Sequence, residues 1–365
     1  MYFEQTDISP LTTHFESLGY RFDKRNGFST FNVFSTVEQE YNALNSGTGL
    51  RDISNNSIIE LTGNDVLDFL HRITTNNIKN LLPALTVDTI FTNEKGRILE
   101  KTKLLHLGNK QILLGQRNDK IKLINWIDKY IIMDDVKPVS LTGRLVVLEL
   151  RGSQSDSFST LLFGDQVKDF VVNSIKRLFL EQAVITAVKC VDENGDVYFL
   201  FLIQPETAAF FVDYCIANKG VFNFSLIGEE AFEMYRIEKG IPSPKELNTN
   251  FNPLEANLSG LISFNKGCYI GQEVIARLDT YQKVQKQIMG VQFCDGEISF
   301  NDCNIFDEAG NEVGQVTSIS KSNYLGKYIG LAFIRKNFAI EGTIIYGIRE
   351  NSKFKIKVNK LPFRK

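Results

Sequence analysis

The stretch KGCYIGQEVIAR (residues 266–277) is the most informative part of this chain for both fold and function. It surrounds one cysteine, Cys268, with an unusual combination of glycines and charged residues. Glycines one residue before and three residues after the cysteine permit a tight turn and a close approach of the backbone to a ligand or partner. Lys266 and Arg277 could favour the thiolate, which is the form of cysteine that reacts or binds metal. A cysteine is by residue type a small buried side chain, but these neighbours point to a functional thiol.

The stretch resembles the pattern K-G-C-[FYW]-x-G-Q-E-x-x-[AS]-R of the YgfZ family of folate-binding proteins, and all nine specified positions match. The resemblance implies a function in making or repairing iron–sulfur clusters. It also implies a relationship to the glycine-cleavage T-protein, an aminomethyltransferase. That family folds as three domains in a cloverleaf around a central channel, which admits tetrahydrofolate.

The resemblance extends over most of the chain, through short segments that occur in the family's order. These are GLRDIS at 49–54, LTGND at 61–65, TNEKGRI at 92–98, YRIEKG at 235–240, PLE at 253–255 and GQVTS at 314–318. Each segment is weak alone, and together they imply a T-protein-like chain.

Length and composition describe an ordinary globular protein. The 365 residues allow two or three domains, and a hydrophobic content of 43% suffices for sizeable cores. The 41 basic and 43 acidic residues nearly balance, which argues against a nucleic-acid-binding protein. The longest apolar run, residues 197–203, is far shorter than the roughly 20 residues that span a bilayer. The start, MYFEQTD, lacks the features of a signal peptide. We therefore expect a cytoplasmic monomer with no membrane or nucleic-acid partner.

The five cysteines and three histidines give no sign of a bound metal. The number of cysteines is odd and no two have C-x-x-C spacing, so we expect neither a disulfide framework nor a zinc site. A standard four-cysteine cluster has no visible set of ligands either. If the link to iron–sulfur chemistry holds, the chain acts on a cluster of another protein, and its partners are folate and client iron–sulfur proteins.

Local patterns predict an α+β region up to about residue 283, followed by an all-β domain. Capping residues predict a helix that ends at Gly47 and a second helix after Asp65, and Gly96 supplies the turn of a hairpin within residues 88–105. Strands are predicted at 58–62, 110–114, 144–150, 184–191, 197–203, 287–293, 313–318, 328–334 and 343–346, and helices at 205–217 and 228–239.

The resemblance refines this prediction to a three-domain T-protein-like cloverleaf with a C-terminal all-β barrel domain. Residues 1–283 would form a folate-binding α+β region of two intertwined subdomains. Residues 284–365 would form the barrel.

One departure from the family bears on activity. Aminomethyltransferases carry aspartates just after the hairpin turn, in the pattern G-G-i-x-D-D, where this chain has Glu100 and Lys101. Glutamate is one methylene longer and lysine has the opposite charge, whereas a carboxylate that steers proton transfer needs close placement. The family's pterin-binding glutamate also has no counterpart in residues 197–203. Both departures disfavour methylene transfer, and neither excludes folate binding.

Five residues are candidates for the site. Cys268 is the expected functional thiol, and Lys266 would assist it or contact an anionic ligand. The resemblance implies that Arg236 faces the folate, since its planar donor fork suits a carboxylate or a pterin carbonyl group. The hairpin that contains Asn93 and Glu100 would approach the same cavity. The alternatives are a solvent-facing Arg236 and an ordinary surface lysine at 266.

Three functions remain open from the sequence. The first is a folate-binding accessory protein for iron–sulfur cluster assembly or repair that uses Cys268. The second is a tetrahydrofolate-dependent aminomethyltransferase or demethylase. The third is a binding module in which folate or a partner occupies the channel and no bond changes. The pair Glu100 and Lys101 disfavours the second, and the setting of Cys268 favours the first over the third.

Overall fold

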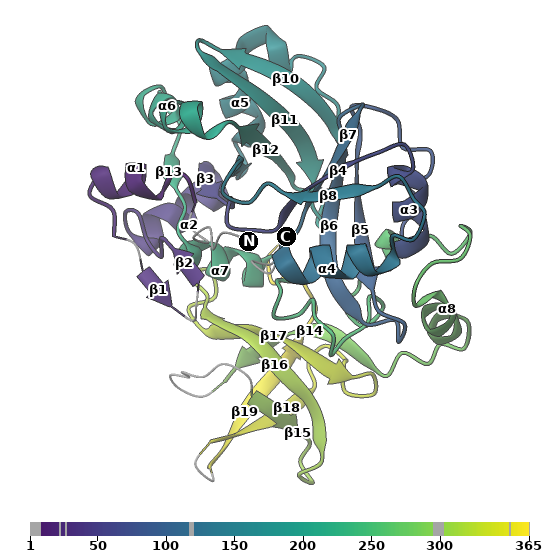
Figure 1. Cartoon of the computed structure of the whole chain (residues 1–365). Helices are drawn as coiled ribbons and strands as arrows, with labels where there is room; N and C mark the ends of the chain where they lie inside the picture. The colour runs from purple at the N-terminus through teal and green to yellow at the C-terminus, as the bar shows by residue number, and fades with distance from the viewer. Residues whose placement is uncertain are drawn as a thin grey trace. The chain divides into compact units, whose positions relative to one another are not determined.

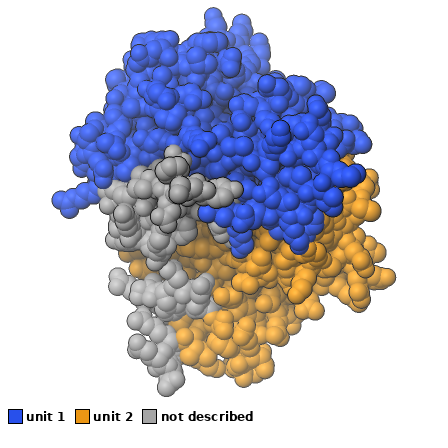
Figure 2. All heavy atoms as spheres, viewed as in Figure 1, with its two compact units in different colours: residues 1–70, 78–88, 102–232 blue, residues 71–77, 89–101, 233–365 orange. Residues whose placement is uncertain are grey.

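The computed structural model describes residues 9–21, 23–25, 28–116, 120–294, 303–349 and 352–364. The start of the chain, from which we expected no signal peptide, lies outside these residues. The chain divides into two compact units (Figure 2): unit 1 comprises Met1–Leu70, Ile78–Asp88 and Thr102–Phe232, and unit 2 comprises His71–Asn77, Thr89–Lys101 and Glu233–Lys365. Among the described residues, no helix is long and apolar enough to cross a membrane.

Unit 1 contains a six-stranded sheet with the order β10-β11-β12-β9-β3-β13 (Figure 1). Its strands are β3 (Thr48–Asp52), β9 (Val146–Arg151), β10 (Ser174–Leu180), β11 (Ala183–Val191), β12 (Val197–Ile203) and β13 (Phe224–Leu226). Neighbours are antiparallel except β13 and β3, which are parallel. Six consecutive residues of β12 are buried, which confirms the prediction that this apolar strand is covered on both faces.

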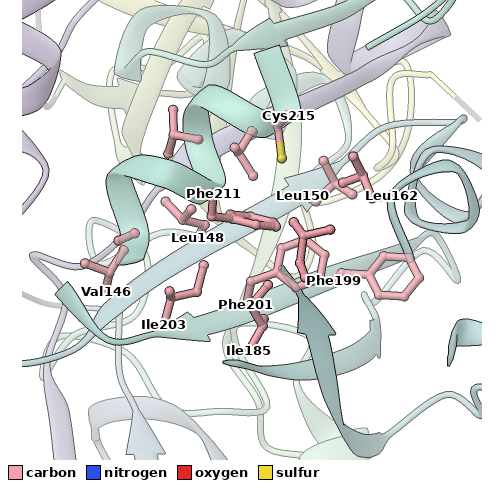
Figure 3. Close-up of a cluster of buried hydrophobic side chains, with 14 of the residues drawn as sticks. Val146, Leu148, Leu150, Leu162, Ile185, Phe199, Phe201, Ile203, Phe211 and Cys215 are labelled. Atoms are coloured by element: carbon pink, nitrogen blue, oxygen red, sulfur yellow. The ribbon is translucent and has the colours of Figure 1, made fainter. Parts of the chain in front are cut away.

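Alternate residues of β12 contribute to two different cores. Phe199 and Phe201 pack with α5 (Ser155–Phe163) and α6 (Pro205–Ala217) in the cluster drawn in Figure 3. Leu200 and Leu202 face the opposite way and pack with residues of a second sheet. Side chains alternate along a strand, so one apolar run serves both layers.

The second sheet has the order β5-β6-β7-β4-β8 and consists of β4 (Ile58–Thr62), β5 (Thr86–Thr92), β6 (Ile98–His106), β7 (Lys110–Leu114) and β8 (Lys137–Ser140). Two further helices belong to this part of the chain, α3 (Val66–Ile73) and α4 (Lys120–Tyr130). The chain of β5 and β6 continues into unit 2, which therefore contains the turn of their hairpin. This hairpin, predicted from Gly96, carries one side of the candidate site.

Unit 2 contains a closed barrel with the strand order β14-β17-β16-β15-β18-β19. The strands are β14 (Lys286–Phe293), β15 (Cys303–Phe306), β16 (Glu312–Lys321), β17 (Tyr328–Arg335), β18 (Ile344–Arg349) and β19 (Ser352–Asn359). Apolar residues of all six strands fill the barrel core, among them Val291, Ile305, Val316, Ile334, Ile345 and Ile356. The all-β character predicted for this region is confirmed.

Figure 1 also labels four further helices and two short strands. They are α1 (Thr12–Ser17), α2 (Val37–Ser46), α7 (Glu229–Glu238), α8 (Gln272–Thr280), β1 (Asp23–Arg25) and β2 (Phe28–Thr30). The capping residues predicted at 35–38 do open α2, but the cap lies one residue later than a capping box of Ser35 and Glu38, since the Thr36 side chain accepts from the Gln39 N–H. Gly47 follows the last turn, as predicted. The barrel forms one compact unit, unit 2, with residues 71–77, 89–101 and 233–285. The domain boundary predicted after residue 283 stays a prediction.

Candidate functional site

Lys266 anchors one end of the signature loop, which we define as residues 266–271. Its side chain is 8% exposed. The Nζ group donates hydrogen bonds to the carbonyl oxygens of His71, of Thr74 at 2.6 Å and of Asn76 at 2.7 Å. These carbonyl groups lie at and just after the C-terminal end of α3, the end of a helix that carries partial negative charge. Nζ also lies 5.0 Å from the centre of the Tyr269 ring.

The three carbonyl partners indicate that the Lys266 side chain is protonated in this arrangement. Burial lowers the pKa of Lys266 to about 7, because desolvation disfavours the charged form, whereas the three carbonyl oxygens at Nζ favour the charged form. Only an ammonium has three N–H groups to donate, and the C-terminal end of a helix favours a cation. All three donors are thus occupied by main-chain oxygens, and a role of Lys266 in chemistry at Cys268 stays a prediction.

The hairpin of β5 and β6 fixes the other end of the signature loop. The Thr92 hydroxyl donates to the Ile270 carbonyl oxygen at 2.6 Å. Gly271 has φ 83 and caps α8, and a Cβ atom there would lie 2.5 Å from the Asn93 carbonyl oxygen. Glycine is therefore required at 271 by both backbone conformation and space. The close approach expected from the sequence is made to the protein's own hairpin, whereas Gly267 has open space around its Cα.

Cys268 lies between these two anchors. It is two residues from Lys266 and two residues from Ile270, and its side chain is exposed. The next residue, Tyr269, is buried in a small cluster with Ile262 and Ile275, and burial raises the pKa of Tyr269 to about 12. The loop thus presents an exposed thiol between two buried residues, Lys266 and Tyr269.

The other cysteines separate into buried and exposed ones. Burial raises the pKa of the Cys190 thiol to about 11, and burial also raises the pKa of Cys215 well above its ordinary value. Cys294 is exposed. The side chain of Cys303 lies outside the described residues. Cys190 and Cys215 are therefore poor nucleophiles, and Cys294 is a natural control for Cys268.

The hairpin residues Asn93 and Glu100 are placed differently from each other. The Asn93 carboxamide oxygen accepts from the N–H groups of Lys95 and Arg97, each at 3.0 Å, so this side chain builds the turn. Glu100 lies on β6 and is 4% exposed, and the adjacent Lys101 is also buried. The folate contacts expected for Asn93 and Glu100 stay predictions.

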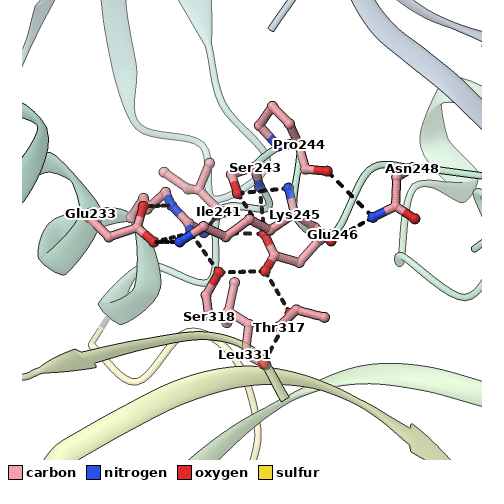
Figure 4. Close-up of polar contacts among 11 residues, drawn as sticks. Glu233, Ile241, Ser243, Pro244, Lys245, Glu246, Asn248, Thr317, Ser318 and Leu331 are labelled. Carbon is pink, nitrogen blue, oxygen red and sulfur yellow. Dashed lines mark hydrogen bonds and ion pairs between the residues drawn. The ribbon is translucent and has the colours of Figure 1, made fainter. Parts of the chain in front are cut away.

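Arg236 is 2% exposed, so the alternative expectation of a solvent-facing residue is wrong. It donates through Nε and Nη2 to the two carboxylate oxygens of Glu233, both at 2.6 Å. Its Nη1 donates to the Ile241 carbonyl at 3.2 Å and to Glu246 at 3.3 Å, and Nη2 also donates to the Ser318 hydroxyl at 2.7 Å (Figure 4). A guanidinium has five N–H groups, and these five contacts give each a partner in unit 2. A folate contact by Arg236 stays a prediction.

Glu246 is a residue of this network that the sequence analysis did not identify. It is fully buried and accepts hydrogen bonds from the N–H and hydroxyl of Ser243 and from the hydroxyls of Thr317 and Ser318. The network joins α7, the turn after it and barrel strand β16. No local pattern marks Glu246, because its partners Thr317 and Ser318 are about seventy residues away in sequence.

Over the part of the chain that the structure describes, no group of three or more His, Cys, Asp or Glu side chains could hold a metal ion. The site is instead built from one exposed thiol and the groups that fix its loop. The loop, the turn of the hairpin and the Arg236 network all belong to unit 2.

Two family models match the chain. The model of the GCVT N-terminal domain matches residues 11–266, and that of the glycine cleavage T-protein C-terminal barrel domain matches residues 286–365. The chain therefore belongs to the glycine cleavage T-protein family, and its fold is the T-protein fold with a C-terminal six-stranded barrel.

Individual relatives agree with this assignment. A protein of Arabidopsis thaliana named "Putative transferase At1g60990, chloroplastic" is 28% identical over 316 residues, which are 86% of this chain and 71% of that protein. An aminomethyltransferase of Bacillus licheniformis is 24% identical over 340 residues, 91% of both chains. The crystal structure of the glycine cleavage system aminomethyltransferase T from Bartonella henselae has a TM-score of 0.85 at 18% identity and covers 97% of both chains, which shows the shared fold.

Proposed function

We propose that this chain is a folate-binding accessory protein for iron–sulfur cluster assembly or repair, and that Cys268 is its functional thiol. The observation that carries the proposal is the exposed position of Cys268 on a loop fixed at both ends. A thiolate is a nucleophile and a soft ligand for iron. The likeness of residues 266–277 to the YgfZ pattern supports the same function. The cluster on which Cys268 acts would be that of a client protein.

Folate binding is the second part of the proposal and is supported by membership in the T-protein family. The ligand would be tetrahydrofolate or a derivative. We propose that Asn93 and Glu100 of the hairpin contribute to its site. Arg236 would have to give up one of its five hydrogen bonds to contact folate, which would cost about 1.5–3 kcal/mol for a bond to a charged group.

The second candidate is tetrahydrofolate-dependent aminomethyl transfer. It is favoured by relatives that are named aminomethyltransferases and cover 91% or more of this chain. It is disfavoured by Glu100 and Lys101, since the resemblance described above implies aspartates there in aminomethyltransferases. Both side chains are buried, so neither can easily rotate to another orientation. Turnover of an aminomethylated carrier protein with tetrahydrofolate would favour this candidate.

The activity of an iron–sulfur enzyme in cells that lack the native chain tests the leading proposal. We expect Cys268→Ser and Cys268→Ala to lose most of the complementing activity while the melting temperature of the purified variants stays close to that of the wild type. The exposed Cys294→Ser is the matched control and should complement fully. Full complementation by Cys268→Ser would contradict the proposal.

A further inference from the structure

The segment that carries Cys268 has few contacts of its own to fix it. Gly267 and Cys268 are both exposed, and no atom lies within 4 Å of the position that a Cβ would take at Gly267. The conformation of this segment is therefore determined by its neighbours, Lys266 on one side and Tyr269 on the other. Tyr269 is held by apolar packing and by the hydrogen bond that its carbonyl oxygen accepts from Gln272 N at 3.2 Å.

Lys266 holds the other side by a polar anchor. Its ammonium bonds three carbonyl oxygens of residues 71–76, which are separated from it by about 190 positions in sequence. The contact is well shielded, because the side chain is only 8% exposed. Charged donors to carbonyl groups form the stronger class of hydrogen bond. With three such bonds, Lys266 fixes the backbone two residues before the thiol.

We propose that Lys266 is a positioning residue for Cys268, which holds the thiol at a fixed place on the surface where a client's cluster can meet it. This inference rests on the proposed function of Cys268. It differs from the catalytic role expected from the sequence, because the three N–H groups of Lys266 are directed at main-chain oxygens. If Lys266 only positions the thiol, its replacement should change the position of the Cys268 side chain and leave the reactivity of the thiol unchanged.

The test compares Lys266→Met, which keeps an apolar side chain of similar length, with Lys283→Met, which removes an exposed lysine of the same unit. Three quantities are measured on each variant. The first is loop exchange, by which we mean hydrogen exchange of the Ser263 and Gln272 amides, which donate to the Thr75 and Tyr269 carbonyl oxygens on either side of Cys268. The others are the rate at which iodoacetamide alkylates Cys268 and the complementation of an iron–sulfur enzyme per folded molecule.

For Lys266→Met we expect amide exchange in the loop to accelerate by about tenfold or more, since strong hydrogen bonds oppose its opening. Complementation should fall towards that of Cys268→Ser. Alkylation should stay within about threefold of the wild-type rate, because the thiol is already exposed. Lys283→Met should match the wild type in all three.

Two results would overturn the inference. One is unchanged loop exchange together with wild-type complementation. The other is alkylation slowed by about tenfold with unchanged loop exchange, which would assign Lys266 to the chemistry of the thiol. If Lys266→Met does not fold, Lys266→Arg replaces it, because a planar guanidinium cannot reproduce the three-way geometry of the ammonium. Faster loop exchange with full complementation by that variant would then refute the positioning role.

A failure of the proposed function is distinguishable from a failure of this inference. If Cys268→Ser complements fully, the function assigned to the thiol is wrong. Loop exchange in Lys266→Met still reports whether the lysine fixes the backbone around the thiol.

Discussion

Replacing Arg236 by methionine should destabilise unit 2 by about 3–5 kcal/mol, the cost of breaking a buried ion pair by removing one partner. The change leaves the fully buried Glu246 carboxylate without its cation and removes both bonds to Glu233. The apolar side chain of methionine occupies much of the same volume, so the loss is chiefly electrostatic. Arg236 should therefore matter first for stability.

The pKa of Glu233 reflects part of the same interaction. Burial raises it, but the charge and hydrogen bonds of Arg236, with a contribution from Lys245, outweigh burial and lower the pKa of Glu233 from 4.5 to about 2. Such a shift corresponds to about 3 kcal/mol. Because the folded pKa is lowered, this stabilisation is present above pH 4.5 and is lost as the pH falls towards 2.

The assay is native-state hydrogen exchange of amides in α7 and β16, because two compact units need not unfold together. Lys245→Met is the matched control: Lys245 contacts the same Glu233 carboxylate at 3.0 Å but is 49% exposed, so its loss should cost below about 1 kcal/mol. The difference between wild type and Arg236→Met should shrink between pH 4.5 and 2. A difference below about 1 kcal/mol at pH 7, or one that persists in full at pH 2, would refute the reasoning.

Three further predictions concern the loop and the reaction. Gly271→Ala should destabilise the protein by about 2–4 kcal/mol in urea unfolding, because alanine is strained in the left-handed conformation and its Cβ would contact the hairpin carbonyl. The control Gly267→Ala should cost below about 1 kcal/mol. Equal effects of the two changes would contradict the role of Gly271. Iodoacetamide should label Cys268 in the folded protein at least about tenfold faster than the two buried cysteines, followed by peptide mass spectrometry. No appreciable methylene transfer from an aminomethylated carrier protein to tetrahydrofolate is expected, and robust turnover would favour the aminomethyltransferase function.

Much of the fold is predictable from local sequence, where the physical signal is itself local. The capping residues at 35–38, the turn at Gly96 and the apolar run of β12 predict elements found within a few residues of their expected positions. Helix α8 escaped prediction because it is short, and its three large apolar residues, Val274, Ile275 and Leu278, are too few to establish a helical period. Strand β19 was missed, although Phe354, Ile356 and Val358 alternate with polar residues there.

The site was predictable only in part. The structure shows that Cys268 is exposed, as the functional thiol expected from its neighbours requires. The partners of Lys266 could not be predicted, because three carbonyl groups about 190 positions away leave no trace in side-chain spacing. The buried network of Arg236 and Glu246 likewise depends on tertiary contacts with a barrel strand. Sequence patterns identify which residue types are unusual, whereas the structure decides which groups they face.

Calorimetric titration of the purified chain and of Cys268→Ser with tetrahydrofolate is the sharpest test of the proposed function. Both proteins should bind tetrahydrofolate at micromolar concentration with the same affinity, because the thiol acts on a client's cluster and does not hold the folate. Absence of binding to the wild type at high micromolar concentration would contradict folate binding. Loss of binding in Cys268→Ser alone would contradict the separation of folate site and thiol.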